Sequence, residues 1–264
     1  SLICNFTQMR YQFTLKLVDP FRNVLPVNYQ FELGSWFFRM INNQESTLYL
    51  GLIMAGYVKS GEPFRQFVFS QLMVPDRKIE GDRLLIQSER VRLIFSTIPD
   101  ESIVQLVKEN FGDVRLVLGD RISQVSFLVE MVERLDEPVF TDKMSFKTLS
   151  PLHLTQKIPG RKNELFLSPE AAEYQELFYE NLHKKFRQLN GFEHAHDFRS
   201  GKFKLRSPVT QKGITIQSGT SGQIKLIGYQ LRFRLQADPE MIRAGYYLGF
   251  GEKNHLGFGC CEIL

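Results

Sequence analysis

A short segment near the end of the sequence contains two Gly-hydrophobic-Gly triplets, separated by five residues that include Lys253 and His255. The glycines of the triplets are Gly249, Gly251, Gly257 and Gly259. Glycine costs backbone entropy, so it occurs mostly where the backbone needs a positive φ or approaches another group closely. A loop of this kind with outward-facing N–H groups forms a concave surface that binds anions. The segment therefore predicts a phosphate-binding loop, with Lys253 and His255 beside the phosphate.

The glycine-rich segment has two other interpretations. A dinucleotide-binding fingerprint needs a third glycine and a helix after it. Asn254 stands where that third glycine would be, three residues after Gly251, which argues against the fingerprint. The other interpretation is a plain hairpin whose glycines let strands pack closely, and the segment alone does not exclude it.

A strongly basic stretch precedes this segment. Residues 199–237 contain eight Lys or Arg and no Asp or Glu. The cations are Arg199, Lys202, Lys204, Arg206, Lys212, Lys225, Arg232 and Arg234. The pairs 202/204 and 232/234 alternate, so in strands each pair lies on one face. A basic sheet face is expected to bind a phosphate backbone, although a solubility face or a docking site for an acidic protein would have the same composition.

Length and composition bound the possible classes of protein. The 264 residues allow one large domain or two of about 120 residues. The sequence has no apolar run long enough to span a membrane. Its three cysteines, Cys4, Cys260 and Cys261, form no Cys/His metal spacing, which predicts a cytoplasmic protein without a metal site. Residues 1–8 are interpreted as a leader or an expression remnant before a natural start at Met9.

The first half of the chain alternates between strand and helix patterns. Strands are expected at 10–18, 64–74, 83–86, 91–98, 114–118 and 125–132, and helices at 33–41, 48–55 and 100–111. Glu80-Gly81-Asp82 is typical of a hairpin turn, and Asp100 is a good helix cap. The order strand, helix, strands, helix, strand indicates a ferredoxin-like domain.

The second half repeats this order more loosely after a boundary at 135–138. Strands are expected at 144–155, 203–205, 213–216, 223–235 and 256–263. Ser168 and Pro169 have the layout of a helix start, and that helix is expected to run to Leu189. A polar loop at 190–201, which holds His194 and His196, is expected to follow it. A short helix follows Asp238. The predicted fold is α+β, with two tandem ferredoxin-like (RRM-like) domains at 9–138 and 139–264.

Taken together, these stretches resemble a known family. The tail GFGEKNHLGFG is similar to the C-terminal glycine-rich loop of the CRISPR-associated repeat-RNA endoribonucleases, which belong to the repeat-associated mysterious protein superfamily. Further similar stretches lie at 25–31, 67–70, 80–84, 146–151 and 242–247. The resemblance covers about residues 9–264.

The resemblance implies a metal-independent, cofactor-free RNase of the cytoplasm. It would cut precursor CRISPR RNA within the repeats by attack of a 2′-hydroxyl, leaving a 2′,3′-cyclic phosphate and a 5′-hydroxyl. Its partners would be CRISPR repeat RNA and, in some members, other CRISPR effector-complex proteins, with no membrane. A monomer or a homodimer is consistent with the resemblance. The RNA-binding residues would be Gly249, Gly251, Lys253, Gly257, Gly259, Lys202, Lys204, Lys225, Arg232 and Arg234.

The sequence departs from the family at two positions. The usual helix histidine falls on Ile53, and a frequent tyrosine falls on Phe38. His255 is then the best-placed acid/base group, with Lys59 and Arg39 as cations that stabilise charge. A non-cleaving module that binds repeat RNA is the alternative that Ile53 and Phe38 favour. A small-molecule-binding ferredoxin-like protein is a third reading, which the basic stretch disfavours.

Overall fold

The structure is a computed structural model that describes residues 10–98, 100–160, 164–190, 201–216 and 221–264. The predictions for residues 1–8, His194, His196 and Arg199 therefore lie outside the described residues. The chain divides into two compact units, an N-terminal unit of residues up to 66 and 71–137, and a C-terminal unit of residues 67–70 and 138–264. Within the described ranges, no helix is both long and apolar enough to cross a membrane.

The N-terminal unit contains an antiparallel sheet in the order β6-β1-β8-β7. Its strands are β1 (Arg10–Leu17), β6 (Arg90–Thr97), β7 (Arg115–Gly119) and β8 (Gln124–Arg134), and its helices are α1 (Gln30–Ile41), α2 (Thr47–Met54) and α3 (Glu101–Phe111). A smaller sheet contains β2 (Val24–Pro26), β5 (Arg83–Ile86) and β4 (Arg77–Glu80). Gly81, at φ 59°, makes the predicted hairpin turn between β4 and β5.

Aromatic side chains fill the core of the N-terminal unit. The rings of Phe37 and Phe95 stack with centroids 4.8 Å apart, and Phe13 meets Phe111 edge-on at 5.3 Å. All four side chains are fully buried or nearly so. The helix cap predicted at Asp100 is confirmed, since its side chain accepts from Ser102 N–H. Ser46 caps α2 in the same way, by accepting from Tyr49 N–H. In this unit, the helix starts that the capping residues favour thus agree with the burial of the aromatic side chains.

The C-terminal unit is built around a four-stranded antiparallel sheet in the order β12-β15-β9-β16. Its strands are β9 (Lys143–Thr148), β12 (Lys202–Leu205), β15 (Arg232–Gln236) and β16 (Cys261–Ile263), and its helices are α4 (Tyr174–Asn190) and α5 (Pro239–Leu248). Shorter elements are β3 (Phe67–Phe69), β10 (Thr155–Gln156), β11 (Leu165–Phe166), the hairpin strands β13 (Thr210–Ile216) and β14 (Ile224–Gln230), and the 3-10 turn η2 (Asn254–Leu256). The chain order β9-α4-β12-β15-α5-β16 is ferredoxin-like.

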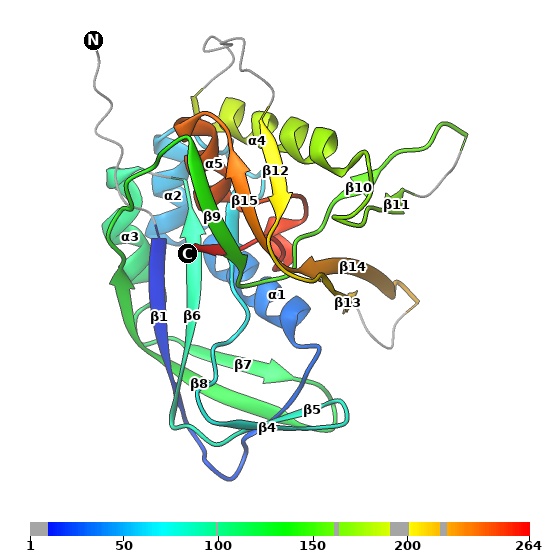
Figure 1. The fold of residues 1–264 in the computed structure, drawn as a ribbon. Helices are drawn as coiled ribbons and strands as arrows, with labels where there is room; N and C mark the ends of the chain where they lie inside the picture. Colours follow the sequence, from blue (N-terminus) through cyan, green and yellow to red (C-terminus); the bar gives the residue numbers. More distant parts are fainter. Residues whose placement is uncertain (1–9, 99, 161–163, 191–200, 217–220) are drawn as a thin grey trace. The chain divides into compact units, whose positions relative to one another are not determined.

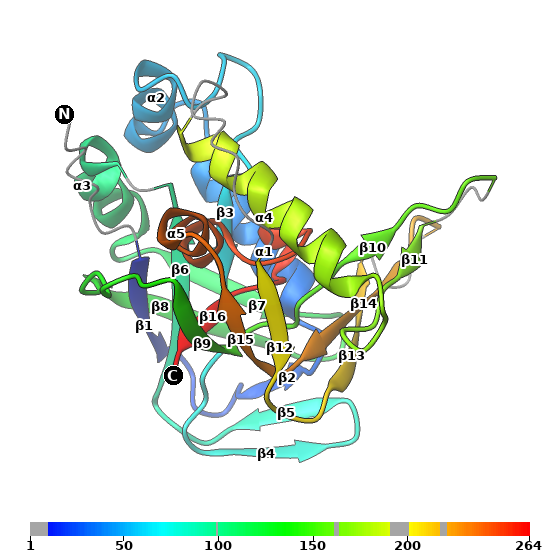
Figure 2. The same cartoon turned by 45° about the horizontal axis from the view of Figure 1, so that its top comes forward.

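One side of this sheet forms the core with the helices (Figure 1, Figure 2). Phe178 of α4 lies 4.8 Å from Phe203 of β12 and 5.8 Å from Phe233 of β15, between ring centroids. Phe250, directly after α5, lies 5.9 Å from Phe178. The opposite side of the sheet is left for polar side chains. The predicted fold class, α+β with two ferredoxin-like units, is confirmed.

Several predicted elements have different bounds. The expected strand at 223–235 is two strands in different sheets, because the chain leaves the β13–β14 hairpin at Leu231, which forms hydrogen bonds with Thr148. The helix expected from Pro169 begins at Tyr174, since Ser168 and Ala171 close separate turns before it. The expected strand at 256–263 is only β16, preceded by η2. The short helix predicted after Asp238 is longer, extending to Leu248.

Candidate nucleic-acid interface

The exposed side of the C-terminal sheet collects cations from neighbouring strands. In β12, Lys202 and Lys204 are exposed, and in β15, Arg232 and Arg234 are exposed, while the residues between them face the core. The antiparallel register places Lys204 directly opposite Arg234. Opposed residues in a pair of strands point to the same side. These cations therefore share one face, as the alternation in the sequence predicted.

Strand β9 adds two lysines that the sequence analysis did not include. Lys147 lies opposite Arg232, and Lys143 lies opposite Gln236, so both point to this side of the sheet. Lys147 donates to Glu262 of β16 at 3.0 Å. We call the six cations the basic sheet face: Lys143, Lys147, Lys202, Lys204, Arg232 and Arg234. The alternation of Lys143 and Lys147 was visible in the sequence, but only the sheet order places β9 beside β15.

The basic sheet face has few compensating acids. Within the described parts of the chain, Lys202, Lys204, Arg232 and Arg234 form no ion pair, and Glu262 is the carboxylate that pairs with Lys147. Like charges on neighbouring strands repel each other, which disfavours the compact state unless an anion binds there. The face therefore presents an unneutralised field for a polyanion.

Lys225 does not belong to the basic sheet face. It lies on β14, opposite Thr215 of β13, in a separate two-stranded hairpin. The expectation that it shares a sheet with Arg232 and Arg234 is therefore wrong. The strands on both sides of Leu231 are half-buried, so the sequence showed one continuous alternation of apolar and polar residues. Such periodicity does not reveal that the chain changes sheet.

The glycine-rich segment is mostly buried, and several of its amides donate to carbonyls of the protein. Phe250 N–H donates to the Gly259 carbonyl at 2.9 Å, Glu252 N–H to the His153 carbonyl at 2.8 Å, and Gly259 N–H to the Pro151 carbonyl at 2.9 Å. The expectation of a loop lined with outward-facing N–H groups is wrong for these amides. Such hydrogen bonds fix the loop to the body of the C-terminal unit.

Positive φ angles and close approach explain the glycines. Gly249, Gly251, Gly257 and Gly259 have φ values of 88°, 71°, 91° and 79°. A Cβ on Gly259 would overlap the Phe250 carbonyl oxygen, and one on Gly251 would overlap the His153 carbonyl oxygen. The close-packing interpretation thus accounts for the glycines better than an open anion cradle does.

A buried pair of side chains holds the glycine-rich segment in place. The Asn254 side-chain amide donates to the carbonyls of Phe250 at 3.2 Å and Phe258 at 3.0 Å. Its oxygen accepts from the Lys185 ammonium of α4 at 2.5 Å. Burial lowers the pKa of Lys185 to about 7, although the charge of Glu252 opposes this shift. Sequence reasoning missed this pair, but the position of Lys185 three residues after buried Leu182 was a usable signal.

The tip of the segment is its accessible part. Lys253 is exposed and adopts a left-handed conformation with φ 57°. His255 is half-buried in η2, and its ring lies edge-on to Phe67 of β3, which belongs to the same unit, with centroids 6.4 Å apart. Phe67 thus supports the imidazole from one side. A cation and an imidazole therefore stand two residues apart on a loop whose base is rigid.

The other predicted catalytic cations belong to the N-terminal unit. Arg39 is exposed in the last turn of α1, and Lys59 is exposed in the turn after α2. Phe38 is half-buried, with the Arg65 guanidinium 5.9 Å from its ring centroid. Ile53 is half-buried on α2. All five histidines of the sequence come after residue 138, so the N-terminal unit has no imidazole to replace the residue expected at Ile53.

His153 is a buried histidine that takes no part in the interface. Its Nδ1 lies 2.6 Å from the Ile227 carbonyl, to which it donates, and its Nε2 has no hydrogen-bond partner among the residues that the structure describes. Burial lowers the pKa of His153, so the ring is neutral at neutral pH. It packs against Phe166 and Phe258, which indicates a structural role. Among the described side chains, no group of three His, Cys, Asp or Glu converges as metal ligands would.

Two family descriptions match this chain. The description "CRISPR-associated protein Cas6, N-terminal" matches residues 24–133, and "CRISPR associated protein Cas6, C-terminal" matches residues 135–263. The endoribonuclease-like protein Cas6nc of Pyrococcus horikoshii is 28% identical over 91% of this chain and 94% of its own. The CRISPR-associated endoribonuclease Cas6 1 of Methanocaldococcus jannaschii is 26% identical over 89% of this chain and 86% of its own.

Solved structures show the same fold. A Cas6-related protein of Pyrococcus furiosus superposes with a TM-score of 0.79 at 23% identity, covering 97% of this chain and 98% of its own. A structure described as an RAMP protein binding different RNA substrates superposes with a TM-score of 0.78 at 24% identity, covering 97% and 99%.

Proposed function

Because this chain belongs to the CRISPR-associated Cas6 family, we propose that it is an endoribonuclease that processes precursor CRISPR RNA within the repeats. Relatives from Methanocaldococcus jannaschii and Pyrococcus furiosus are named CRISPR-associated endoribonucleases. The observation that supports RNA binding most strongly is the basic sheet face, with its six cations and one paired acid. A phosphate backbone is the ligand that matches such a face.

The spacing of the cations suits a flexible strand of RNA. Side chains two residues apart on one strand are separated by about 7 Å, and neighbouring strands lie about 4.8 Å apart. Lysine and arginine can therefore contact successive phosphates without a single fixed register. The exposed Lys253 in the glycine-rich segment of the same unit is a further cation that RNA can contact. The glycines act by placing this tip, because several amides around them donate within the protein.

The proposed chemistry is transesterification within the RNA. The 2′-hydroxyl upstream of the cut loses its proton to a base and attacks the scissile phosphorus, while the 5′-oxygen of the next nucleotide accepts a proton and leaves. The products are a 2′,3′-cyclic phosphate and a 5′-hydroxyl. The protein must align the attacking oxygen, exchange the two protons, and stabilise charge on the phosphorane.

We assign the proton-transfer role to His255 and the charge-stabilising role to Lys59 and Arg39. His255 is a half-buried imidazole beside the exposed Lys253, which is the combination that phosphate chemistry needs. The side chains of Lys59 and Arg39 are exposed, so a phosphate can reach them. General acid–base catalysis contributes about 10²- to 10⁴-fold to such a step.

A second function is favoured by a specific observation. The N-terminal unit has no histidine, and the positions of the usual acid/base groups are Ile53 and Phe38. A module that binds repeat RNA without cutting it would need the basic sheet face and would not need an imidazole. This alternative predicts tight, salt-sensitive binding and intact RNA after long incubation.

Cleavage of a synthetic repeat RNA separates the two functions. The protein is incubated in EDTA with the repeat and with a copy that carries a 2′-deoxy nucleotide at the cut. The nuclease proposal predicts one cut with a cyclic phosphate end, and no cut in the deoxy copy. Intact repeat RNA, bound with high affinity, would establish the non-cleaving module instead.

Several associated properties follow from the same proposal. The protein acts in the cytoplasm, on CRISPR repeat RNA, as a monomer or a homodimer, and it hands its product to other CRISPR effector-complex proteins. The proposed domains are 9–138 and 139–264, although residues 67–70 of the first belong to the C-terminal compact unit. Size-exclusion chromatography with light scattering measures the assembly state directly, with and without repeat RNA.

A further inference from the structure

A pocket in the N-terminal unit lies outside every feature discussed above. It has a volume of about 460 Å³ and is formed by the turn between β1 and β2 together with the turn between β7 and β8. The residues that matter for its chemistry are Phe21, Arg22, Arg121 and Ile122. Phe21 is 94% exposed and Ile122 is 81% exposed. Two large apolar side chains at the same pocket are therefore exposed to solvent.

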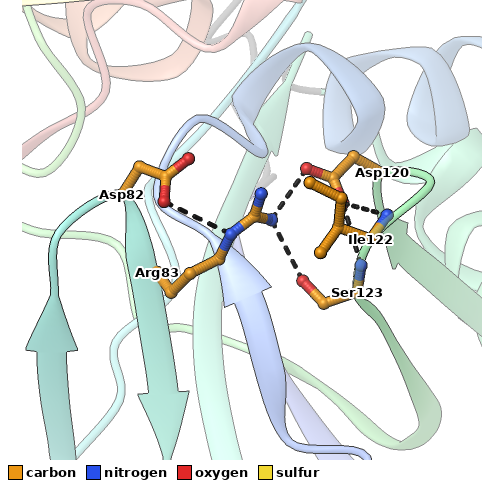
Figure 3. A network of polar contacts seen from close by, with 5 residues as sticks. All are labelled: Asp82, Arg83, Asp120, Ile122 and Ser123. Atoms are coloured by element: carbon orange, nitrogen blue, oxygen red, sulfur yellow. Dashed lines mark hydrogen bonds and ion pairs between the residues drawn. The ribbon is translucent and has the colours of Figure 1, made fainter.

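Hydrogen bonds preform the wall that carries Ile122 (Figure 3). The Asp120 carboxylate accepts from Ile122 N–H at 2.8 Å and Ser123 N–H at 2.9 Å. Arg83 of β5 donates to Asp120 at 2.7 Å and to the Ser123 hydroxyl at 3.1 Å. Burial of Asp120 works against its ionisation, but these amides and Arg83 together lower the pKa of its carboxyl. Asp120 is therefore ionised, and its carboxylate is already bound by Arg83 and by the amides of its own turn.

The opposite wall is held by backbone contacts. Phe21 N–H donates to the Asp19 carboxylate at 2.9 Å, and Arg22 N–H donates to the Asp19 carbonyl at 3.1 Å. Asn23 exchanges hydrogen bonds with the Ile86 backbone at 2.8 and 2.9 Å. The phenyl ring of Phe21 is thus exposed by a fixed turn, and a pocket of this kind needs little reorganisation to bind a ligand.

The charges around the pocket favour an anion. Arg121 forms no ion pair or hydrogen bond within the described residues, and Arg22 meets only Asp19, at 3.9 Å. Asp120 faces its own turn and Arg83. An exposed aromatic ring beside guanidinium groups is the combination that stacks nucleobases and binds their phosphates.

The size of the pocket favours a nucleotide over a protein as its ligand. A specific protein interface buries about 800 Å² on each partner, far more than two apolar side chains provide. A cavity of about 460 Å³ lies in the range that small ligands occupy, and one base with its phosphate fits that range. We propose that this pocket binds a single nucleotide of single-stranded RNA, with the base stacked on Phe21 and the phosphate held by Arg121 and Arg22. The proposal rests on the proposed RNA function and gives it a second contact point.

Photo-crosslinking tests the pocket without requiring cleavage. A short single-stranded RNA containing 4-thiouridine is irradiated with the full-length protein, and the crosslinked peptides are identified by mass spectrometry. The proposal predicts crosslinks to peptides containing residues 19–24 or 120–124. It also predicts that Phe21→Ala and Arg121→Ala each lower the affinity for this RNA by about tenfold, whereas Phe21→Trp preserves it. Ile79→Ala removes another exposed apolar side chain of the same unit, outside the pocket lining, and is the matched control.

The outcomes also separate this proposal from the proposed function. Wild-type affinity in Phe21→Ala and Arg121→Ala, with no crosslink at either turn, overturns the pocket proposal even if repeat RNA is cut. An equal loss in Ile79→Ala also overturns it, because the effect would then be nonspecific. Crosslinks at the pocket in a protein that leaves the repeat intact support the pocket while rejecting the nuclease.

Discussion

Replacement of Lys185 by Met is the clearest test of the buried pair that holds the glycine-rich segment. Lys185 is enclosed within the C-terminal unit and donates to Asn254. Burial lowers its pKa to about 7, with Glu252 acting in the opposite direction. In the unfolded chain the pKa of a lysine is about 10.4. Methionine keeps the length of the aliphatic side chain but removes the titrating group.

The sign of the pH effect follows from the two pKa values. Below about pH 7 the lysine is charged in both states, and the cost of burying its charge is constant. Between about pH 7 and 10 the unfolded state binds more protons than the folded state, so stability rises with pH. From about pH 7 to about pH 9 the gain is about 2 kcal/mol. Above both values the lysine is neutral in both states, and the effect ends.

Hydrogen exchange measured by mass spectrometry reports this gain in stability for the C-terminal unit, which contains Lys185. The single tryptophan, Trp36, lies in the N-terminal unit and does not report on α4. Exchange of peptides from α4 and α5 gives the free energy of opening, after correction for the pH dependence of intrinsic exchange. The comparison of wild type with Lys185→Met removes the contributions of all other titrating groups.

From pH 7 to pH 9 the free energy of opening of the wild type should rise by about 2 kcal/mol relative to that of the variant. The variant should lack this rise, because it has no titrating group at position 185. An equal pH dependence in the two proteins would refute the assignment of a depressed pKa to Lys185. A wild type that loses stability as the pH rises would refute the direction of the shift.

Three other substitutions test the site. Gly259→Ala should destabilise the C-terminal unit clearly more than Gly160→Ala does, as measured by thermal unfolding. Both glycines have a positive φ, which costs another residue about 1–2 kcal/mol, but of the two only Gly259 would place a Cβ against a carbonyl oxygen. Equal losses of stability would contradict this explanation. Asn254→Ala should lower the free energy of opening of the C-terminal unit and weaken repeat-RNA binding in fluorescence anisotropy, because two loop carbonyls lose their donor; unchanged affinity would show that the loop is held otherwise. His255→Ala should slow single-turnover cleavage by about 10²-fold or more with little change in RNA affinity, and an unchanged rate would remove His255 from the chemistry.

Local signals were sufficient for much of the fold. Asp100 and Asp238 cap helices as their types predict, since a cap depends on only a few neighbouring residues. The alternation of Lys202 and Lys204 was enough to predict that they share a face, because strand geometry has a period of two. The ferredoxin-like order followed from the same periodicities.

Other features depended on contacts between distant segments. Lys143 and Lys147 joined the basic sheet face only because β9 pairs with β15, more than 80 residues later. The inward direction of the Gly259 amide depends on Pro151, which the sequence places far away. The spacing of Lys185 from Leu182 was a signal of burial, but its partner Asn254 lies 69 residues away and could not be predicted from the sequence. Charge and composition alone therefore overestimated how open the glycine-rich segment is.

The salt dependence of repeat-RNA affinity tests the basic sheet face most directly. Wild type is compared with a variant in which Lys202, Lys204, Arg232 and Arg234 are all replaced by Ala, which leaves the buried side of the sheet unchanged. Each phosphate contact contributes about −0.7 to the slope of log affinity against log salt for single strands. If the RNA lies on this face, the variant should bind more weakly and its slope should be shallower by about 3. An unchanged affinity with an unchanged slope would show that the RNA binds elsewhere.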